Sequence, residues 1–329
     1  MQVATRTDTM SNIASFFGVN SEVLRRHYKD RVSGFKEWSQ ITHADQYLIY
    51  PQNITSQLSI DEVSLSKGEL YTIVTNKRTG VGNKECLVAV VNGTNARVIR
   101  EVLERIPLEK RKLVTEVTMD MARNMALAVE QCFPNCKKVI DRFHVVRLVC
   151  DAMQHVRVKL RWKAIEDENN AVKKAREKGQ KYHPEVLTNG DSVKEMLARS
   201  RYLLYATPED WTASQSKRAK LLFERYPEIQ TAYHLTLSFR AIYKNTNKQV
   251  ASHQFQVWRD AVAKAKIEEF NSAANSLDYH LDDILNFFDN RNTNANAESF
   301  NSKIKSFRAN LRGVTDIKFF LFRLEKLFA

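Results

Sequence analysis

The sequence is poor in glycine and proline, with only 9 and 6 among its 329 residues. This scarcity excludes collagen-like and proline-rich architectures. It also leaves little room for a glycine-rich phosphate loop, and neither the GxGxxG nor the GxxxxGK[ST] pattern occurs. The four cysteines form no CxxC pair, so we expect no zinc ribbon or disulfide framework. No apolar run reaches the roughly 20 residues that cross a bilayer, so we expect no membrane-spanning segment.

Positive charge, in contrast, is in excess. Lys and Arg number 51 against 38 Asp and Glu, which gives a net charge of +13 and a pI near 9.5. A balance of this kind favours a polyanionic partner, either nucleic acid or an acidic membrane surface. Because the first residues also lack the apolar stretch of a signal peptide, we expect a cytoplasmic protein that binds nucleic acid.

The N-terminal region has the spacing of a helix-turn-helix. Residues 9–31 predict two short helices, with Thr9 or Ser11 capping the first, Gly18 ending it and Ser21 capping the second. A plain helical hairpin with a solvated basic face fits the same pattern. In the helix-turn-helix interpretation, three basic residues of the second helix face a duplex: Arg25, Arg26 and Lys29.

From residue 56 onward the pattern changes to that of strands. Three apolar, β-branched segments indicate an antiparallel meander, and alternating helices and strands follow it. The predicted order is βββαβαβ, an α/β fold whose mixed sheet has parallel later strands. The strands are expected at 58–63, 70–74, 86–91, 114–120 and 138–141, and the helices near 96–106 and 122–132.

The segment from 144 to about 288 predicts helices without a strong strand. We expect Trp162, Trp211 and Trp258 to lie in its core. The basic residues between 137 and 181 form either a nucleic-acid path or an ordinary solvated helix face.

An Asn-rich loop over 290–296 precedes a last helical region starting near residue 294 or 295. Four residues form a buried stripe along it: Phe300, Ile304, Phe307 and Leu311. Five others are expected on the opposite side: Glu298, Asn301, Ser302, Lys305 and Arg312.

Three carboxylates stand out by position. Asp61 lies in the first strand, Asp120 ends the fourth, and Glu298 opens the late helix. If adjacent strands and a packed helix bring them together, their oxygens suit two Mg²⁺ or Mn²⁺ ions that assist phosphoryl transfer. Taken singly, each acid also fits a cap or a solvated residue. Glu62 alternates with Asp61 and is expected on the other face of the strand, outside a shared site.

At this point the chain resembles the DDE transposases of the ISL-three class of bacterial insertion sequences, which have a ribonuclease-H-like core. The stretch Arg201–Tyr205 through Trp211 is similar to the helical insertion of that family. Four spaced motifs carry the resemblance: Ser59-Ile-Asp-Glu-Val63, Thr118-Met-Asp-Met121, Asp141-Arg-Phe-His-Val145 and the segment Thr293–Lys305 with Glu298.

The resemblance implies a domain plan and a set of site residues. A helix-turn-helix region over 1–50 precedes the first part of a ribonuclease-H-like core at 51–150, an all-α insertion at 151–289, and the last part of the core at 290–329. Asp61, Asp120 and Glu298 become the catalytic, metal-binding triad, with Asp141 and His144 as supporting residues. For His144, an ordinary hydrogen-bonded histidine at a helix start remains an equal interpretation. Four residues beside Glu298 are candidates to hold phosphates: Lys303, Lys305, Arg308 and Arg312.

The resemblance further implies a transposase that cuts the double-stranded DNA ends of its element and joins them to target DNA, as a homodimer. The family's cysteine-rich zinc-binding module does not appear before Cys86, so it is either lost or supplied by a separately encoded partner. Two alternatives remain. One is a nuclease or resolvase on the same fold, and the other is a non-catalytic DNA-binding protein derived from a transposase.

Overall fold

The structure is a computed structural model that describes residues 9–66, 68–77, 86–291, 295–311, 314 and 316–329. The side chains of residues 65, 66 and 295–299 lie outside that description. The chain divides into two compact units. The first joins Met1–Asp141 to Asn290–Ala329, and the second is Arg142–Asp289.

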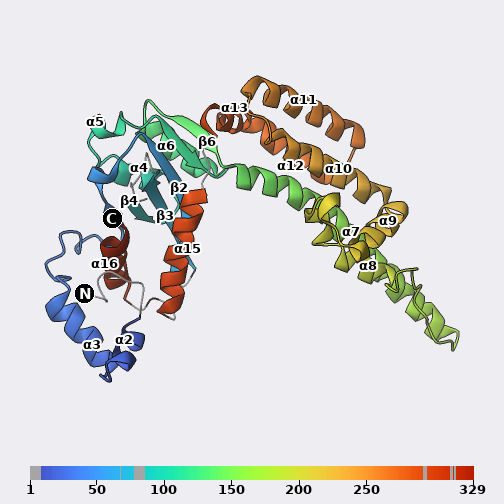
Figure 1. The fold of residues 1–329 in the computed structure, drawn as a ribbon, viewed down its shortest axis with the longest axis horizontal. Helices are drawn as coiled ribbons and strands as arrows, with labels where there is room; N and C mark the ends of the chain where they lie inside the picture. Colours follow the sequence, from blue (N-terminus) through green and yellow to red (C-terminus); the bar gives the residue numbers. More distant parts are fainter. Residues whose placement is uncertain (1–8, 67, 78–85, 292–294, 312–313, 315) are drawn as a thin grey trace. The chain divides into compact units, whose positions relative to one another are not determined.

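The first unit is built on a six-stranded sheet in the order β1-β4-β3-β2-β5-β6 (Figure 1). β2, β3 and β4 form the expected antiparallel meander, and β5 and β6 run parallel to β2. The sequence analysis missed β1, a three-residue strand paired with the edge of β4, because so short a segment carries no clear alternation. The strands are Tyr47–Ile49 (β1), Gln57–Ser66 (β2), Glu69–Asn76 (β3), Leu87–Asn92 (β4), Glu116–Met119 (β5) and Lys137–Ile140 (β6).

Helices connect the strands and flank the sheet. The parallel strands β5 and β6 are linked by α6, as a crossover between parallel neighbours requires. This mixed sheet, with helices after the meander, is consistent with a ribonuclease-H-like core. The helices of this unit are Met10–Phe16 (α2), Ser21–His27 (α3), Tyr28–Val32 (η1, a π-helical turn), Pro51–Asn53 (η2), Ala96–Leu103 (α4), Leu108–Arg111 (α5), Arg123–Cys132 (α6), Ala295–Asn310 (α15) and Ile317–Phe328 (α16).

The N-terminal helices begin largely as the sequence predicts. Thr9 caps α2 by accepting a hydrogen bond from the Asn12 amide, and Gly18 adopts a positive φ of +64° after the helix. The cap of α3 is Asn20 rather than Ser21, because the Asn20 side chain accepts from two amides of the first turn. The two predicted helices are therefore confirmed, and whether they read DNA stays a prediction.

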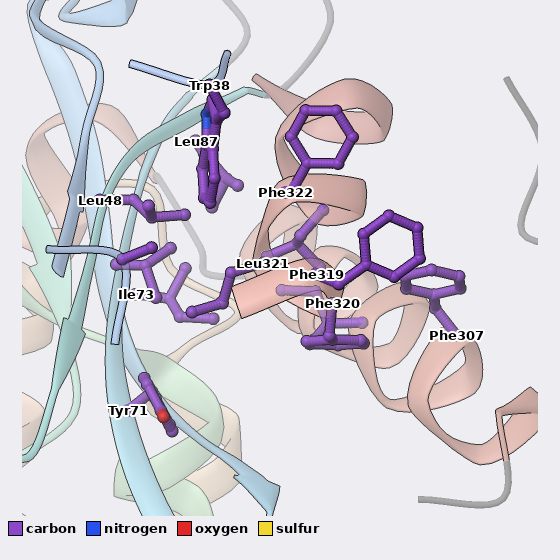
Figure 2. Close-up of a cluster of buried hydrophobic side chains, with 14 of the residues drawn as sticks. Trp38, Leu48, Tyr71, Ile73, Leu87, Phe307, Phe319, Phe320, Leu321 and Phe322 are labelled. Atoms are coloured by element: carbon purple, nitrogen blue, oxygen red, sulfur yellow. The ribbon is translucent and has the colours of Figure 1, made fainter. Parts of the chain in front are cut away.

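One hydrophobic cluster joins both ends of the chain to the sheet (Figure 2). α16 presents Phe319, Leu321 and Phe322 to this cluster, and Trp38 packs edge-on against Phe322 at a ring-centroid distance of 5.4 Å. The Trp38 indole also donates a 2.7 Å hydrogen bond to Glu325 of α16. Residues before the sheet and the last helix therefore share one core.

Helix α15 packs on β2 through the predicted stripe. Phe300, Ile304 and Phe307 are fully buried and Leu311 is partly buried, so the stripe is confirmed. Asn301, which was expected on the solvated side, is buried at 5% exposure. That expectation was wrong because Asn301 lies beside Phe300 and Ile304, at the shoulder of the stripe, where it reaches the sheet.

The second unit is helical, with one isolated β-bridge between Val186 and Ser192 among its described residues. Trp258 is buried as expected, but Trp162 is 64% exposed, so its assignment to the core was wrong. Among the described residues, no helix is both long and apolar enough to span a bilayer. Its helices are Arg142–Glu177 (α7), Val193–Arg199 (α8), Leu203–Tyr205 (η3), Pro208–Asp210 (η4), Ala213–Arg225 (α9), Pro227–Ile242 (α10), Lys248–Ala265 (α11), Glu268–Tyr279 (α12), Leu281–Leu285 (α13) and Phe287–Asn290 (α14), whose last residue belongs to the first unit.

Candidate active site

Two aspartates lie at the same level of neighbouring parallel strands. In the register of β2 and β5, Ser59 is paired with Thr118. Asp61 and Asp120 each follow that pair by two residues, Asp61 within β2 and Asp120 directly after β5 ends. Both residues are half-buried, so their carboxylates lie where the sheet meets solvent.

Asp61 is held by its own strand and by α15. One carboxylate oxygen, Oδ1, accepts a hydrogen bond from the Glu62 amide at 2.8 Å. The other, Oδ2, accepts from the side-chain amide of Asn301 at 2.5 Å. Because Asn301 is buried and comes from a distant part of the sequence, this bond fixes α15 against the strand that carries Asp61.

Asp120 lies at the entrance to α6. Its Oδ1 accepts a 2.8 Å hydrogen bond from the Ala122 amide, the residue that caps this helix. Helix N-termini carry partial positive charge, which favours a carboxylate there. The side chain is therefore oriented by local backbone, at the end of the strand.

Glu62 belongs to the same electrostatic neighbourhood. Burial raises the pKa of its carboxyl, the negative charges of Asp120 and Asp61 raise it further, and a hydrogen bond from Asn124 opposes them. Strand alternation predicted Glu62 to lie away from the site. It comes close to Asp120 because that residue follows the end of β5 and no longer obeys strand alternation.

A buried polar strip continues from Asp61 along the same face of the sheet. The Lys77 ammonium donates a hydrogen bond to the Thr118 hydroxyl and lies 3.5 Å from Glu116 Oε1. Asn290 donates to the other oxygen, Glu116 Oε2, at 3.1 Å. Buried charges are stable only when they are paired and hydrogen-bonded in this way. The strip consists of Ser59, Thr75, Lys77, Glu116 and Thr118, all at most 5% exposed.

Helix α15 carries the third predicted acid. Glu298 lies in its first turn, one turn before Asn301, but the Glu298 side chain falls outside the described residues. Lys303 and Lys305 are exposed on this helix, whereas Arg308 is half-buried and donates to the Ser64 carbonyl at 3.3 Å. Arg312 lies outside the described residues.

The chain matches a transposase family model over residues 58–324, which covers the sheet, the helical unit and most of α16. It belongs to the ISL3 family of DDE transposases. Two similar relatives are the transposases for insertion sequence element IS1557 from two strains of Mycobacterium tuberculosis, CDC 1551 and H37Rv. Each is 23% identical over 253 residues, which is 76% of this chain and 54% of the relative. The chain thus spans about half the length of these curated relatives.

Two further predicted residues of this ISL3 family member follow β6. Asp141 is buried at 2% exposure directly after the strand, and its amide donates to the Met119 carbonyl at 2.8 Å. His144 lies in the first turn of α7, half-buried, with its ring edge-on to Phe143 at 5.5 Å. These residues fall in different units, Asp141 in the first and His144 in the second.

The basic residues of the N-terminal helices differ in what they contact. Arg25 and Arg26 are exposed, and Arg25 pairs with Glu22 one turn earlier. Lys29 lies 2.5 Å from Asp316, with its ammonium above the rings of Phe35 and Phe319. In this structure Lys29 therefore connects η1 to the start of α16.

The donor set around Asp61 suits a hard divalent cation. Asp61, Glu62 and Asp120 offer carboxylate oxygens, and the mutual repulsion expressed in the raised pKa of Glu62 is relieved by a bound cation. No group of three or more His, Cys, Asp or Glu side chains is arranged to hold a metal among the residues the structure describes, which do not include the Glu298 side chain.

Proposed function

We propose that this protein is a DNA transposase that cleaves the ends of its insertion sequence and transfers them to target DNA. Membership of the ISL3 family supports the reaction class. The single observation that carries the assignment of residues is the alignment of Asp61 with Asp120, together with the Asn301 bond that fixes the Glu298-bearing helix on β2.

In this proposal Asp61, Asp120 and Glu298 hold two Mg²⁺ or Mn²⁺ ions. When bound, such ions lower the pKa of water and stabilise the leaving oxygen of an in-line displacement. Asn301 and the Glu62 amide keep the Asp61 carboxylate in one orientation. The Ala122 amide does the same for Asp120.

The reaction has two phosphoryl-transfer steps without a covalent protein intermediate. Water attacks a phosphorus atom at the element end and the bond to the 3′ oxygen breaks, which leaves a 3′-OH and a 5′ phosphate. The freed 3′-OH then attacks a phosphodiester of target DNA and displaces its 3′ oxygen. Exposed Lys303 and Lys305 on the helix of Glu298 are suited to hold phosphates.

DNA recognition by α2 and α3, and a homodimer that holds two ends, complete the proposal. Arg25 and Arg26 are the exposed cations of α3 for this purpose. A separately encoded zinc-binding partner remains part of it. All three are expectations from the pattern of the residues and from the two-ended reaction.

The test is cleavage of labelled element-end duplexes with Mg²⁺ or Mn²⁺ by the wild type and by Asp61→Asn, Asp120→Asn and Glu298→Gln. We expect each variant to lose at least about 10³-fold in rate with unchanged DNA affinity, because metal-held carboxylates supply several kcal/mol of transition-state stabilisation. Glu101→Gln, an exposed acid on α4, is the matched control and keeps wild-type activity.

Three results would contradict this proposal. Wild-type cleavage by any one of the three acid variants refutes that residue's assignment. Cleavage without joining identifies a nuclease or resolvase instead. DNA binding without metal-dependent activity, even with an added zinc-binding partner, identifies a non-catalytic DNA-binding protein.

A further inference from the structure

The helical unit contains a buried arginine that has no carboxylate partner among its described neighbours. Arg157, on α7, is only 5% exposed. Its Nε donates to the Gln154 side chain at 2.7 Å and its Nη1 donates to the Leu197 carbonyl at 2.9 Å. Both acceptors are neutral, so they orient the guanidinium without balancing its charge. A buried charge of this kind is costly unless something compensates it.

Two more arginines lie around Arg157. Arg161 is one turn further along α7 and is exposed. Arg201 is also exposed, and its backbone carbonyl accepts a 3.1 Å hydrogen bond from the same Gln154 side chain. Burial lowers the pKa of Arg157, and the positive charges of Arg161 and Arg201 lower it further. The three guanidinium groups therefore repel one another in the free protein.

Aromatic side chains border these arginines. The Arg201 guanidinium lies over the Tyr202 ring, 5.4 Å from its centroid, and Tyr202 is 73% exposed. A fourth guanidinium, that of Arg240, donates to the Tyr205 carbonyl at 2.8 Å. The nearby carboxylate of Asp151 lies 3.6 Å from Arg147 instead. The surface therefore presents positive charge and an exposed ring.

We propose that Arg157, Arg161 and Arg201 form a phosphate-binding surface that holds the backbone of double-stranded DNA on the helical unit. Guanidinium groups bind phosphate oxygens through paired hydrogen bonds, and an anion placed among them removes their mutual repulsion. The choice of DNA as the polyanion rests on the proposed function. Neutral anchoring of Arg157 fixes one donor group in advance, while exposed Arg161 and Arg201 meet the strand.

The test uses the full chain and fluorescence anisotropy with a labelled element-end duplex, an unrelated DNA duplex and an RNA duplex, over a series of salt concentrations. The variant is Arg161→Gln/Arg201→Gln, since both side chains are exposed and their loss spares the fold. Arg176→Gln, an exposed arginine on the same helix, is the control for loss of one charge. Arg161→Lys/Arg201→Lys keeps the charge.

We expect the double glutamine variant to bind both DNA duplexes at least about tenfold more weakly at 0.1 M salt, because each lost phosphate contact lowers the salt slope by roughly 0.9. The lysine variant should keep most of the affinity, and Arg176→Gln should match the wild type. Wild-type affinity and slope in the double glutamine variant overturn the inference. Selective loss of element-end binding, or a larger loss on RNA than on DNA, also overturns it.

Failure of this inference can be told apart from failure of the proposed function. If the wild type binds DNA but does not cleave it, the proposed reaction fails while the arginine surface is still judged by the salt slopes. If the wild type cleaves and the double glutamine variant binds DNA normally, only the surface is refuted. At saturating DNA the double glutamine variant should cleave at the wild-type rate, because it leaves the acidic site unchanged.

Discussion

The buried Lys77–Glu116 pair gives the sharpest test of how the sheet beside Asp61 is stabilised. Each side chain is 6% exposed, and the Lys77 ammonium lies 3.5 Å from Glu116. At an effective dielectric constant of 20, two unit charges at this distance attract by about 5 kcal/mol. Desolvation offsets much of this attraction, so the pair as a whole contributes far less than that figure.

Removal of one partner has a larger effect than removal of both. We expect Lys77→Met to lower the free energy of unfolding of the first unit by about 3–5 kcal/mol, because it leaves Glu116 buried and uncompensated. Glu116→Gln should cost a similar amount, although glutamine can still accept the Asn290 hydrogen bond. The double variant should cost little more than either single one, so the coupling energy is about 2–3 kcal/mol.

Amide hydrogen exchange of peptides that cover β3 and β5 is the appropriate assay, because a two-unit chain need not unfold in one step. The control is Lys112→Met, an exposed lysine paired with Glu109, which should change protection by under about 0.5 kcal/mol. Single-variant costs that simply add in the double variant would refute the coupling and, with it, the assigned role of the buried strip.

Three further predictions follow from other contacts. Phe307→Ala should destabilise the first unit by about 3–5 kcal/mol in denaturant unfolding, since its buried ring stacks on Phe320 at 5.3 Å, and a loss under about 1 kcal/mol would contradict this packing. Asn301→Leu should cost about 1.5–3 kcal/mol and slow cleavage without weakening DNA binding, because the Asp61 carboxylate loses a buried donor; unchanged cleavage by a folded variant would contradict it. Burial raises the pKa of Asp191, but the hydrogen bonds of Arg218 and Arg199 outweigh it and leave this pKa below its usual value of 3.8. The stabilisation is therefore present above pH 3.8 and is lost as pH falls below it, so the deficit of Arg218→Met, about 2 kcal/mol at pH 7, should shrink there in urea titrations, and a constant deficit would refute the pairing.

Periodicity in the sequence was sufficient to predict the sheet. The strands β2 to β6 carry continuous apolar and β-branched runs, and the Phe300–Phe307 stripe repeats at helical spacing. Such patterns reflect burial on one face, which single residues record directly. Short β1 escaped because its pairing with β4 depends on the edge of the sheet and not on its own pattern.

Side-chain partners were harder to predict than elements. Asn301 was assigned to the solvated face, although its position on the shoulder of the helix and its spacing of one turn from Glu298 were signals that both could face the sheet. Trp162 was assigned to the core because tryptophan is usually buried. The Lys29–Asp316 contact joins residues 287 positions apart, and no local pattern reveals such a pair.

The most direct test of the central claim is anomalous diffraction at the manganese edge from crystals of the protein with element-end DNA and Mn²⁺. The account predicts two manganese peaks, with carboxylate oxygens of Asp61, Asp120 and Glu298 within about 2.0–2.3 Å of them. Manganese bound elsewhere, or a Glu298 carboxylate more than about 10 Å from both aspartates in the DNA complex, would contradict it, since metal–oxygen bonds are short.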